Sequence, residues 1–190
     1  MKAKNKLVYG VGVNDADYVI NPSFDGKTVK CPFYFKWLGM LERAYSRSFH
    51  ERYPTYTECS VHSDWHTLST FKSWMELQNW EGMQLDKDLL VKGNKVYSSD
   101  TCVFVTREVN TFMTESKATR GALPLGVSVI AGRYKARLTV KGKVTSLGSF
   151  NAPEEAHQAY RAAKWELAVQ LASEQSDPRV AAALIERYKL

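Results

Sequence analysis

Between Ser116 and Phe150 the chain carries seven basic residues and no acidic one, a composition suited to binding a polyanion. The seven are Lys117, Arg120, Arg133, Lys135, Arg137, Lys141 and Lys143. Polar and apolar residues alternate from Arg133 to Val140, and a strand sends alternate side chains to opposite faces. One face would then be cationic, with charges about 7 Å apart. Like charges in a row repel each other unless an anion meets them, and the phosphates of nucleic acid are such an anion.

The excess charge of the whole chain lies in this segment. Residues 1–115 carry 14 basic and 14 acidic residues, and residues 151–190 carry 5 and 6. The net charge of +6 therefore arises between residues 116 and 150. A localised basic patch is typical of a nucleic-acid footprint. The alternative is a solvated, lysine-rich edge strand that prevents aggregation between sheets.

Three strands and a long helix would position these cations. We expect strands at about 126–130, 133–140 and 143–147, with a hairpin turn at Lys141-Gly142. The helix would begin at Asn151 as its cap, with Pro153 in the first turn and Glu154 reaching back to the cap, and would run to about Ser173. Its small apolar residues would let it lie close on the sheet. A short helix would follow from Arg179 to Tyr188, and its apolar face would pack on the domain or pair with a second subunit in a homodimer.

The residue spacing over this region resembles the APETALA/ethylene-response-factor DNA-binding domain. The matching positions are Gly126-Val127, Arg133-Tyr134-Lys135-Ala136, Gly142-Lys143, Leu147-Gly148-Ser149-Phe150, Glu154-Glu155-Ala156 and Ala159-Tyr160. The resemblance implies that the strands enter the major groove of double-stranded DNA, with Arg133, Lys135 and Arg137 facing it. This chain lacks the strand tryptophans of that family and has a lysine among the arginines. Contact with phosphates is therefore a safer expectation than base-specific readout, because arginine pairs well with guanine whereas lysine acts more as a point charge.

A second group of residues with chemical potential runs from Gln84 to Asn110. It is predicted to form a strand at 84–91, a loop with Gly93-Asn94, a strand at 102–105 and a helix capped by Thr106. This order brings a carboxylate at the end of the first strand near a side chain on the helix, where one divalent metal can sit. Taken alone, Asp86 and Asp88 are better explained as a solvated strand end or turn, and Asn94 as a turn residue.

That order resembles the HNH endonucleases found in phage genomes, and residues 30–113 resemble a phage-associated branch of them. The matching elements are Trp37 to Arg43, Thr55-Tyr56, Trp65, Phe71, Trp74, Leu85 to Asp88 and Tyr97-Ser98. The resemblance implies that Asp86 and Asn110 are ligands of magnesium or manganese. It also implies that Lys87 stands in the place of the histidine general base, and that Asp88 is a substitute base or an extra ligand.

Several functions stay open because Lys87 stands in the place of the histidine. Histidine titrates near neutral pH, whereas lysine is normally protonated there, although it can still hold a phosphate or stabilise a leaving oxygen. The site then cuts through altered chemistry, binds metal and DNA without cutting, or is kept for its fold. We expect a DNA-binding phage-type protein that is an HNH-like endonuclease or nickase. One alternative is a catalytically inactive DNA-binding regulator or inhibitor with the nuclease fold, and another is a module whose basic strand meets an acidic protein.

Cys59, His62 and His66 have the spacing of zinc ligands, with Cys31 as a fourth candidate. The histidines fall around Trp65 at the start of an apolar helix, and no second Cys-x-x-Cys pair supports them. We therefore favour a buried cysteine beside surface or capping histidines over a structural zinc site.

Together these elements predict an α+β protein made of several parts. The parts are an HNH-like ββα-metal module at 1–115, a linker at 116–124, a DNA-binding domain with three antiparallel strands on one helix at 125–175, and a terminal helix at 176–190. In the first part we expect a helix after Pro32, a loop at 48–60 and a helix capped by Thr67 or Ser69. Three widely spaced cysteines indicate a reducing compartment, and no stretch approaches the ~20 apolar residues of a membrane helix. We expect a cytoplasmic protein without a membrane partner, in the host cytoplasm if it is phage-encoded.

Overall fold

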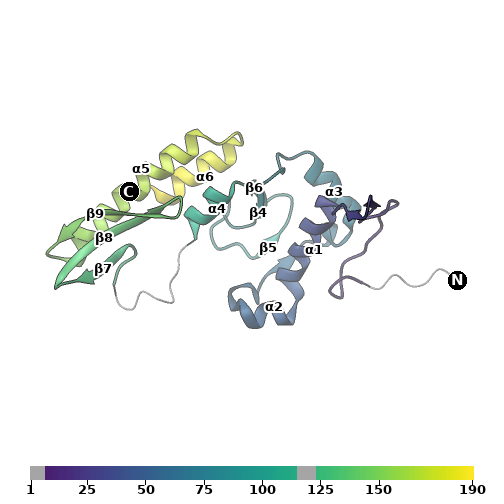
Figure 1. Ribbon diagram of the computed structural model, residues 1–190, viewed down its shortest axis with the longest axis horizontal. Coiled ribbons are helices and arrows are strands. Elements are labelled where there is room, and N and C mark those ends of the chain that lie inside the picture. The colour runs from purple at the N-terminus through teal and green to yellow at the C-terminus, as the bar shows by residue number, and fades with distance from the viewer. Residues whose placement is uncertain (1–6, 115–122) are drawn as a thin grey trace. The chain divides into compact units, whose positions relative to one another are not determined.

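The computed structural model describes residues 7–114 and 123–190 of the chain (Figure 1). The fold is mixed α+β, as predicted, and divides into two compact units, Met1–Val105 and Thr106–Leu190. The predicted boundary at residue 115 differs from this division, which places the helix after Thr106 in the second unit. No helix among the described residues has both the length and the apolar character needed to cross a membrane.

The first unit is built around helix α1, Pro32–Tyr45. Pro32 lies in the first turn, where its missing N–H costs nothing. The helix buries Trp37, Met40, Leu41 and Ala44, which form the centre of the unit's hydrophobic core. A small antiparallel hairpin, β1 (Ser23–Phe24) and β2 (Lys27–Thr28), precedes the helix.

The expectation of a loop at 48–60 was wrong. Helix α2 occupies Arg47–Arg52, and a 3-10 turn, η1, occupies Pro54–Tyr56. Ser46 caps α2 by accepting a hydrogen bond from the Phe49 N–H, which satisfies one of the unpaired donors of the first turn. The helix buries none of its residues, so it has no apolar periodicity by which a sequence pattern could reveal it.

Two short strand pairs complete the first unit. Strand β3 (Ser60–Val61) pairs in parallel with β5 (Val96–Tyr97), and β4 (Gln84–Asp86) pairs antiparallel with β6 (Val103–Val105). The predicted strand at 84–91 is therefore shorter than expected, because the chain turns after Asp86. The β3–β5 pair was not predicted, since two-residue strands carry no periodic signal.

Helix α3 (Leu68–Glu76) follows the 3-10 turn η2 (Ser63–His66) and is capped from a distance. Thr67 occupies the N-cap position but its side chain makes no capping bond. Instead Asp15 accepts hydrogen bonds from the Ser69 N–H at 2.9 Å and from the Ser69 hydroxyl at 2.5 Å. Neither of the two predicted residues supplies the cap, because a carboxylate from the N-terminal segment takes that role.

The second unit begins with α4 (Arg107–Met113), which Thr106 caps as predicted. Strands β7 (Val127–Ile130), β8 (Arg133–Val140) and β9 (Lys143–Phe150) form an antiparallel sheet in that order. The turn at Lys141-Gly142 is confirmed, and both of its residues have positive φ, as a two-residue hairpin turn requires.

Helix α5 (Pro153–Ser173) packs on this sheet, and α6 (Pro178–Tyr188) runs beside α5 (Figure 1). The predicted cap by Asn151 was wrong, because Ala152 occupies the N-cap position without a side-chain bond. Val180 and Leu184 of α6 are buried within the unit, so its apolar face packs on the domain. Pairing of α6 with a second subunit stays a prediction.

Candidate nucleic-acid interface

Strand β8 has the predicted two faces. Ala136 and Leu138 are buried in the core between the sheet and α5, and Tyr134 and Val140 pack against that core. The opposite parity holds Arg133, Lys135, Arg137 and Thr139, of which both arginines and Thr139 are exposed and Lys135 is half-buried. We call Arg133, Lys135 and Arg137 the cationic stripe. Its three cations share one face because the strand's other face is held by α5.

Small polar residues surround the cationic stripe on the neighbouring strands. Lys135 lies opposite Ser128 of β7 and Ser149 of β9, and Arg137 lies opposite Ser146. Directly opposite residues of an antiparallel pair point to the same face of the sheet. Short hydroxyl side chains on both sides leave the longer cationic side chains standing above the sheet surface.

Neutral groups hold the two arginines of the stripe. Arg133 Nη2 donates to the Ser149 carbonyl at 3.2 Å, and Arg137 Nη2 donates to Ser128 Oγ at 2.6 Å. Within residues 7–114 and 123–190, none of the ion pairs involves a member of the cationic stripe. No carboxylate of the described residues therefore neutralises the stripe.

The sheet is irregular at the arginine nearest its centre. The register between β8 and β9 shifts between Ala136 and Arg137, leaving Leu147 as an extra residue of β9. Next to it, Gly148 adopts a φ of 135°, outside the range of ordinary strands. A bulge increases the local twist of the sheet, and here it lies directly opposite Ala136 and Arg137 of β8.

The remaining predicted contacts do not all join the stripe. Lys141 lies in the turn, where its exposed Nζ is 3.5 Å from Oε1 of the half-buried Glu108 of α4. Lys143 lies opposite Val140, which places it on the apolar side of the sheet. Lys117 and Arg120 lie outside the described residues.

Beside the stripe, the second unit contains a cavity of about 630 Å³ between α4, the end of β8 and α5. Arg137 and Lys141 line it together with Lys164 of α5, which is 7 % exposed. Lys164 Nζ donates to the Phe112 carbonyl at 2.5 Å and lies 3.8 Å from the centre of the Phe112 ring. Sequence patterns missed Lys164 because it interrupts the apolar face of its helix.

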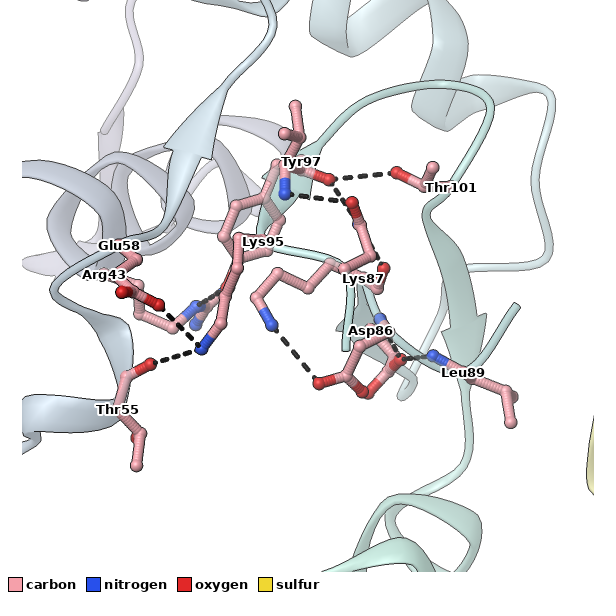
Figure 2. A network of polar contacts seen from close by, with 12 residues as sticks. Arg43, Thr55, Glu58, Asp86, Lys87, Leu89, Lys95, Tyr97 and Thr101 are labelled. Atoms are coloured by element: carbon pink, nitrogen blue, oxygen red, sulfur yellow. Dashed lines mark hydrogen bonds and ion pairs between the residues drawn. The ribbon is translucent and has the colours of Figure 1, made fainter. Parts of the chain in front are cut away.

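In the first unit, the predicted metal ligand Asp86 closes a turn at the end of β4 (Figure 2). Its Oδ1 accepts hydrogen bonds from the Asp88 N–H at 2.9 Å and the Leu89 N–H at 2.7 Å. Burial of the carboxyl raises the pKa of Asp86, the charge of Asp88 raises it further, and the two N–H bonds act in the opposite direction. A structural function therefore already accounts for one of its oxygens.

Lys87, in the place of the expected histidine, is buried with 9 % of its surface exposed. Its Nζ lies 3.3 Å from Asp88 Oδ2 and 5.9 Å from the ring centres of both Tyr56 and Tyr97. The Lys87 carbonyl accepts a bond from Asn94 Nδ2 at 2.6 Å, so Asn94 closes the loop as a turn residue. The lysine is thus fixed between two aromatic rings and a carboxylate.

The proposed two-ligand metal site stays a prediction, because Asp86 lies in the first unit and Asn110 on α4 of the second. The donors of the first unit fit a divalent ion poorly as they stand, since the Lys87 ammonium beside Asp88 would repel a second cation. Across the described ranges, no three His, Cys, Asp or Glu side chains gather as a metal site would require.

The candidate zinc ligands each have another environment. Cys59 is buried, and His62 caps η2 by accepting a bond from the Asp64 N–H. His66 Nε2 lies 3.1 Å from the Val61 carbonyl and 3.3 Å from the Tyr45 hydroxyl. The interpretation of these residues as a buried cysteine and surface or capping histidines, without zinc, stays a prediction.

Two further cations lie near Lys87 and were not predicted. Arg43 Nε donates to the Tyr97 hydroxyl at 2.9 Å, and Lys95 Nζ donates to the Thr55 carbonyl at 3.1 Å and lies 4.0 Å from Glu58 (Figure 2). Arg43 and Tyr97 are 54 residues apart in the sequence, so only the fold brings these two together.

No family model matches the chain, and neither a curated protein nor a solved structure matches it. The resemblances to HNH endonucleases and to the APETALA/ethylene-response-factor domain therefore stand on their residues alone.

Proposed function

We propose that the protein binds double-stranded DNA through the outer face of the β7–β8–β9 sheet. The observation that carries this proposal is the cationic stripe, three cations on one face of a strand without a carboxylate partner among the described residues. Strands can lie in the major groove, where their side chains reach both phosphates and base edges.

The outer face of the sheet also carries exposed apolar side chains. Ile130 lies opposite Arg133 and is 40 % exposed, and Val144 lies opposite Thr139 and is 58 % exposed. Apolar side chains in the major groove contact the methyl group of thymine, and arginine pairs with guanine. The arrangement therefore supports phosphate binding along the stripe with apolar contacts at both ends.

The test is binding of a fluorescent duplex by anisotropy at several salt concentrations. Arg133→Ala and Arg137→Ala are each expected to weaken binding and to reduce the salt slope by about 1. Arg161→Ala is the control, because Arg161 is an exposed arginine on α5, which covers the other face of the sheet. Equal effects from all three variants would show that only net charge matters. Failure of the protein to bind duplex at low salt would overturn the proposal and favour an acidic protein partner.

Metal-dependent cutting of DNA is the second candidate function. It is favoured by the order of elements, since β4 and β6 pair antiparallel and α4 begins after the single residue Thr106. A divalent ion would supply charge stabilisation at a phosphodiester. The test is nicking of supercoiled plasmid with magnesium or manganese, which Asp86→Ala should abolish while duplex binding persists. A plasmid left intact with either metal would leave the inactive DNA-binding protein as the better account.

A further inference from the structure

Lys36 and Arg43 lie on one side of α1 with Gly39 between them. Residues three and seven positions apart share a face of an α-helix, so these three form a continuous row, which we call the α1 row. All three are half-buried and border the core residues of the helix. The row is separate from the sheet and belongs to the other unit.

Both cations of the α1 row are held by neutral partners. Lys36 Nζ donates to the Met83 carbonyl and lies 6.0 Å from the centre of the Phe104 ring. Arg43 donates to the Tyr97 hydroxyl, and its Cζ lies 5.6 Å from that ring's centre. Within the two described ranges, neither cation belongs to an ion pair.

The two cations also act on one another. Burial lowers the pKa of Lys36, and the positive charge of Arg43 lowers it further. Two half-buried like charges on one helix face repel each other, and an anion bound there would relieve that repulsion. The α1 row therefore resembles the cationic stripe, since both hold cations that form no ion pair among the described residues.

Gly39 leaves the space between them open. A methyl group at this position would have only Arg43 Nη1 as a neighbour, at 3.8 Å. Glycine inside a helix costs about 0.5–1 kcal/mol relative to alanine, and no packing neighbour explains it here. A glycine flanked by two cations lets an external backbone approach the helix surface closely.

More positive charge lies beyond Arg43, around Tyr97 (Figure 2). Lys87 and Lys95 each have a carboxylate nearby, Asp88 and Glu58. Burial raises the pKa of the Cys59 thiol, and the charges of Lys87, Lys95 and Arg43 act in the opposite direction. Lys87, Lys95 and Arg43 thus act on the same thiol, so further positive charge lies near the Arg43 end of the α1 row.

We propose that the α1 row binds the sugar–phosphate backbone of nucleic acid, as a contact of the first unit independent of the sheet. The Cα atoms of Lys36 and Arg43 are about 10 Å apart along the helix axis, and the two side chains are anchored to different partners. A row of that length offers contacts to successive phosphates of a polymer. The proposal deepens the proposed function but does not depend on the sheet residues.

The first experiment measures binding of a fluorescent duplex by the full chain at several salt concentrations. Lys36→Gln and Arg43→Gln are each expected to reduce the salt slope by about 1. Arg47→Gln is the matched control, since the Arg47 side chain is 94 % exposed and its charge is already paired with Glu51. If Arg43→Gln binds like Arg47→Gln, the α1 row is not a contact. The sheet proposal is then judged separately, by Arg133→Ala and Arg137→Ala.

A second set of variants separates charge from folding. Arg43→Lys keeps the charge and should retain most of the affinity that Arg43→Gln loses, with thermal melting confirming that both fold. Gly39→Glu and Gly39→Gln have nearly the same size, so a larger loss with glutamate reports the charge between the cations. Equal affinity of Arg43→Lys and Arg43→Gln, or of the two Gly39 variants, would overturn an electrostatic contact.

Competitors decide between a polymer and a free anion. Inorganic phosphate and a single nucleotide are titrated against the bound duplex at constant ionic strength. Little competition by either is expected, because a polymer presents many linked phosphates to the protein and each competitor presents only one at a time. Displacement of duplex by inorganic phosphate in wild type, but not in Arg43→Gln, would assign the row to a small anion and overturn the polymer contact.

Discussion

Gly126 lies against the ring of Tyr160 so closely that a methyl group on Gly126 would be 2.0 Å from Tyr160 Cδ2. Gly126 has a φ of 80° and its carbonyl accepts a hydrogen bond from the Arg137 N–H at 2.9 Å. Tyr160 is a buried residue of α5. The contact therefore joins the helix to the start of β7 and, through one hydrogen bond, to an arginine of the cationic stripe.

Gly126→Ala is expected to destabilise the second unit strongly. The added methyl group forces the tyrosine ring or the strand to move, at about 1–3 kcal/mol for overpacking. The positive φ adds about 1–2 kcal/mol. Gly132→Ala is the matched control, since Gly132 has a φ of 73° but open space around it, and should show the conformational cost alone. Urea denaturation of both variants measures the difference, and equal losses would contradict the packing argument.

Replacements at Asp86 distinguish its turn from a metal-binding function. Asp86→Asn keeps an oxygen acceptor for the Asp88 and Leu89 N–H groups, whereas Asp86→Ala leaves them without it. We expect Asp86→Ala to be less stable than Asp86→Asn by about 1–3 kcal/mol. A ligand function alone would leave the two variants equally stable in the presence of a chelator.

The stability of Asp86→Asn relative to wild type should change with pH in a definite direction. Burial raises the pKa of Asp86 above its usual 3.8, so the folded chain holds this proton to higher pH than the unfolded chain. The resulting stabilisation is complete below that value and is lost as pH rises through the folded pKa. Asp86→Asn removes this loss, so its stability relative to wild type should increase from acid to neutral pH. A difference independent of pH would contradict the raised pKa.

The three cysteines should differ sharply in reactivity. Cys102 is fully buried and burial raises its pKa to about 12, while Cys59 is buried with a raised pKa. Thiol reagents attack the thiolate of accessible groups, so only the half-buried Cys31 should react in the folded protein near pH 8. A thiol-disulfide reagent should report one fast group in buffer and three in denaturant. Fast reaction of Cys102 in buffer would mean that the first unit opens readily.

Local patterns predicted the second unit well and the first unit in part. The parity of β8, the turn at Lys141-Gly142 and the cap at Thr106 depend on neighbouring residues, and all three are confirmed. The cap of α3 depends on Asp15, 54 residues before Ser69, which no local pattern contains. The predicted cap at Asn151 failed because Pro153 can start a helix without a side-chain partner.

In the candidate site, too, local patterns predict some residues and the tertiary fold determines the others. Sequence parity identifies the cationic stripe, because strand alternation needs no tertiary information. It cannot place Lys143, whose face depends on the register across the hairpin. Nor can it bring Arg43 and Lys87 to the ring of Tyr97, since their segments meet only in the folded unit.

Charge reversal on the two sides of the sheet tests whether the register determines DNA binding. Lys135→Glu places a carboxylate within the cationic stripe, and Lys143→Glu places one on the opposite side. Both change the net charge equally, so a purely long-range attraction would weaken equally in the two variants. Screening limits exposed charges to about 8 Å at 0.15 M salt, so at that salt concentration Lys135→Glu should lose much more duplex affinity than Lys143→Glu. Lowering the salt should bring the two variants closer together, as the screening length grows. If they already bind alike at 0.15 M salt, the sheet attracts DNA by its net charge and the stripe is not its docking face.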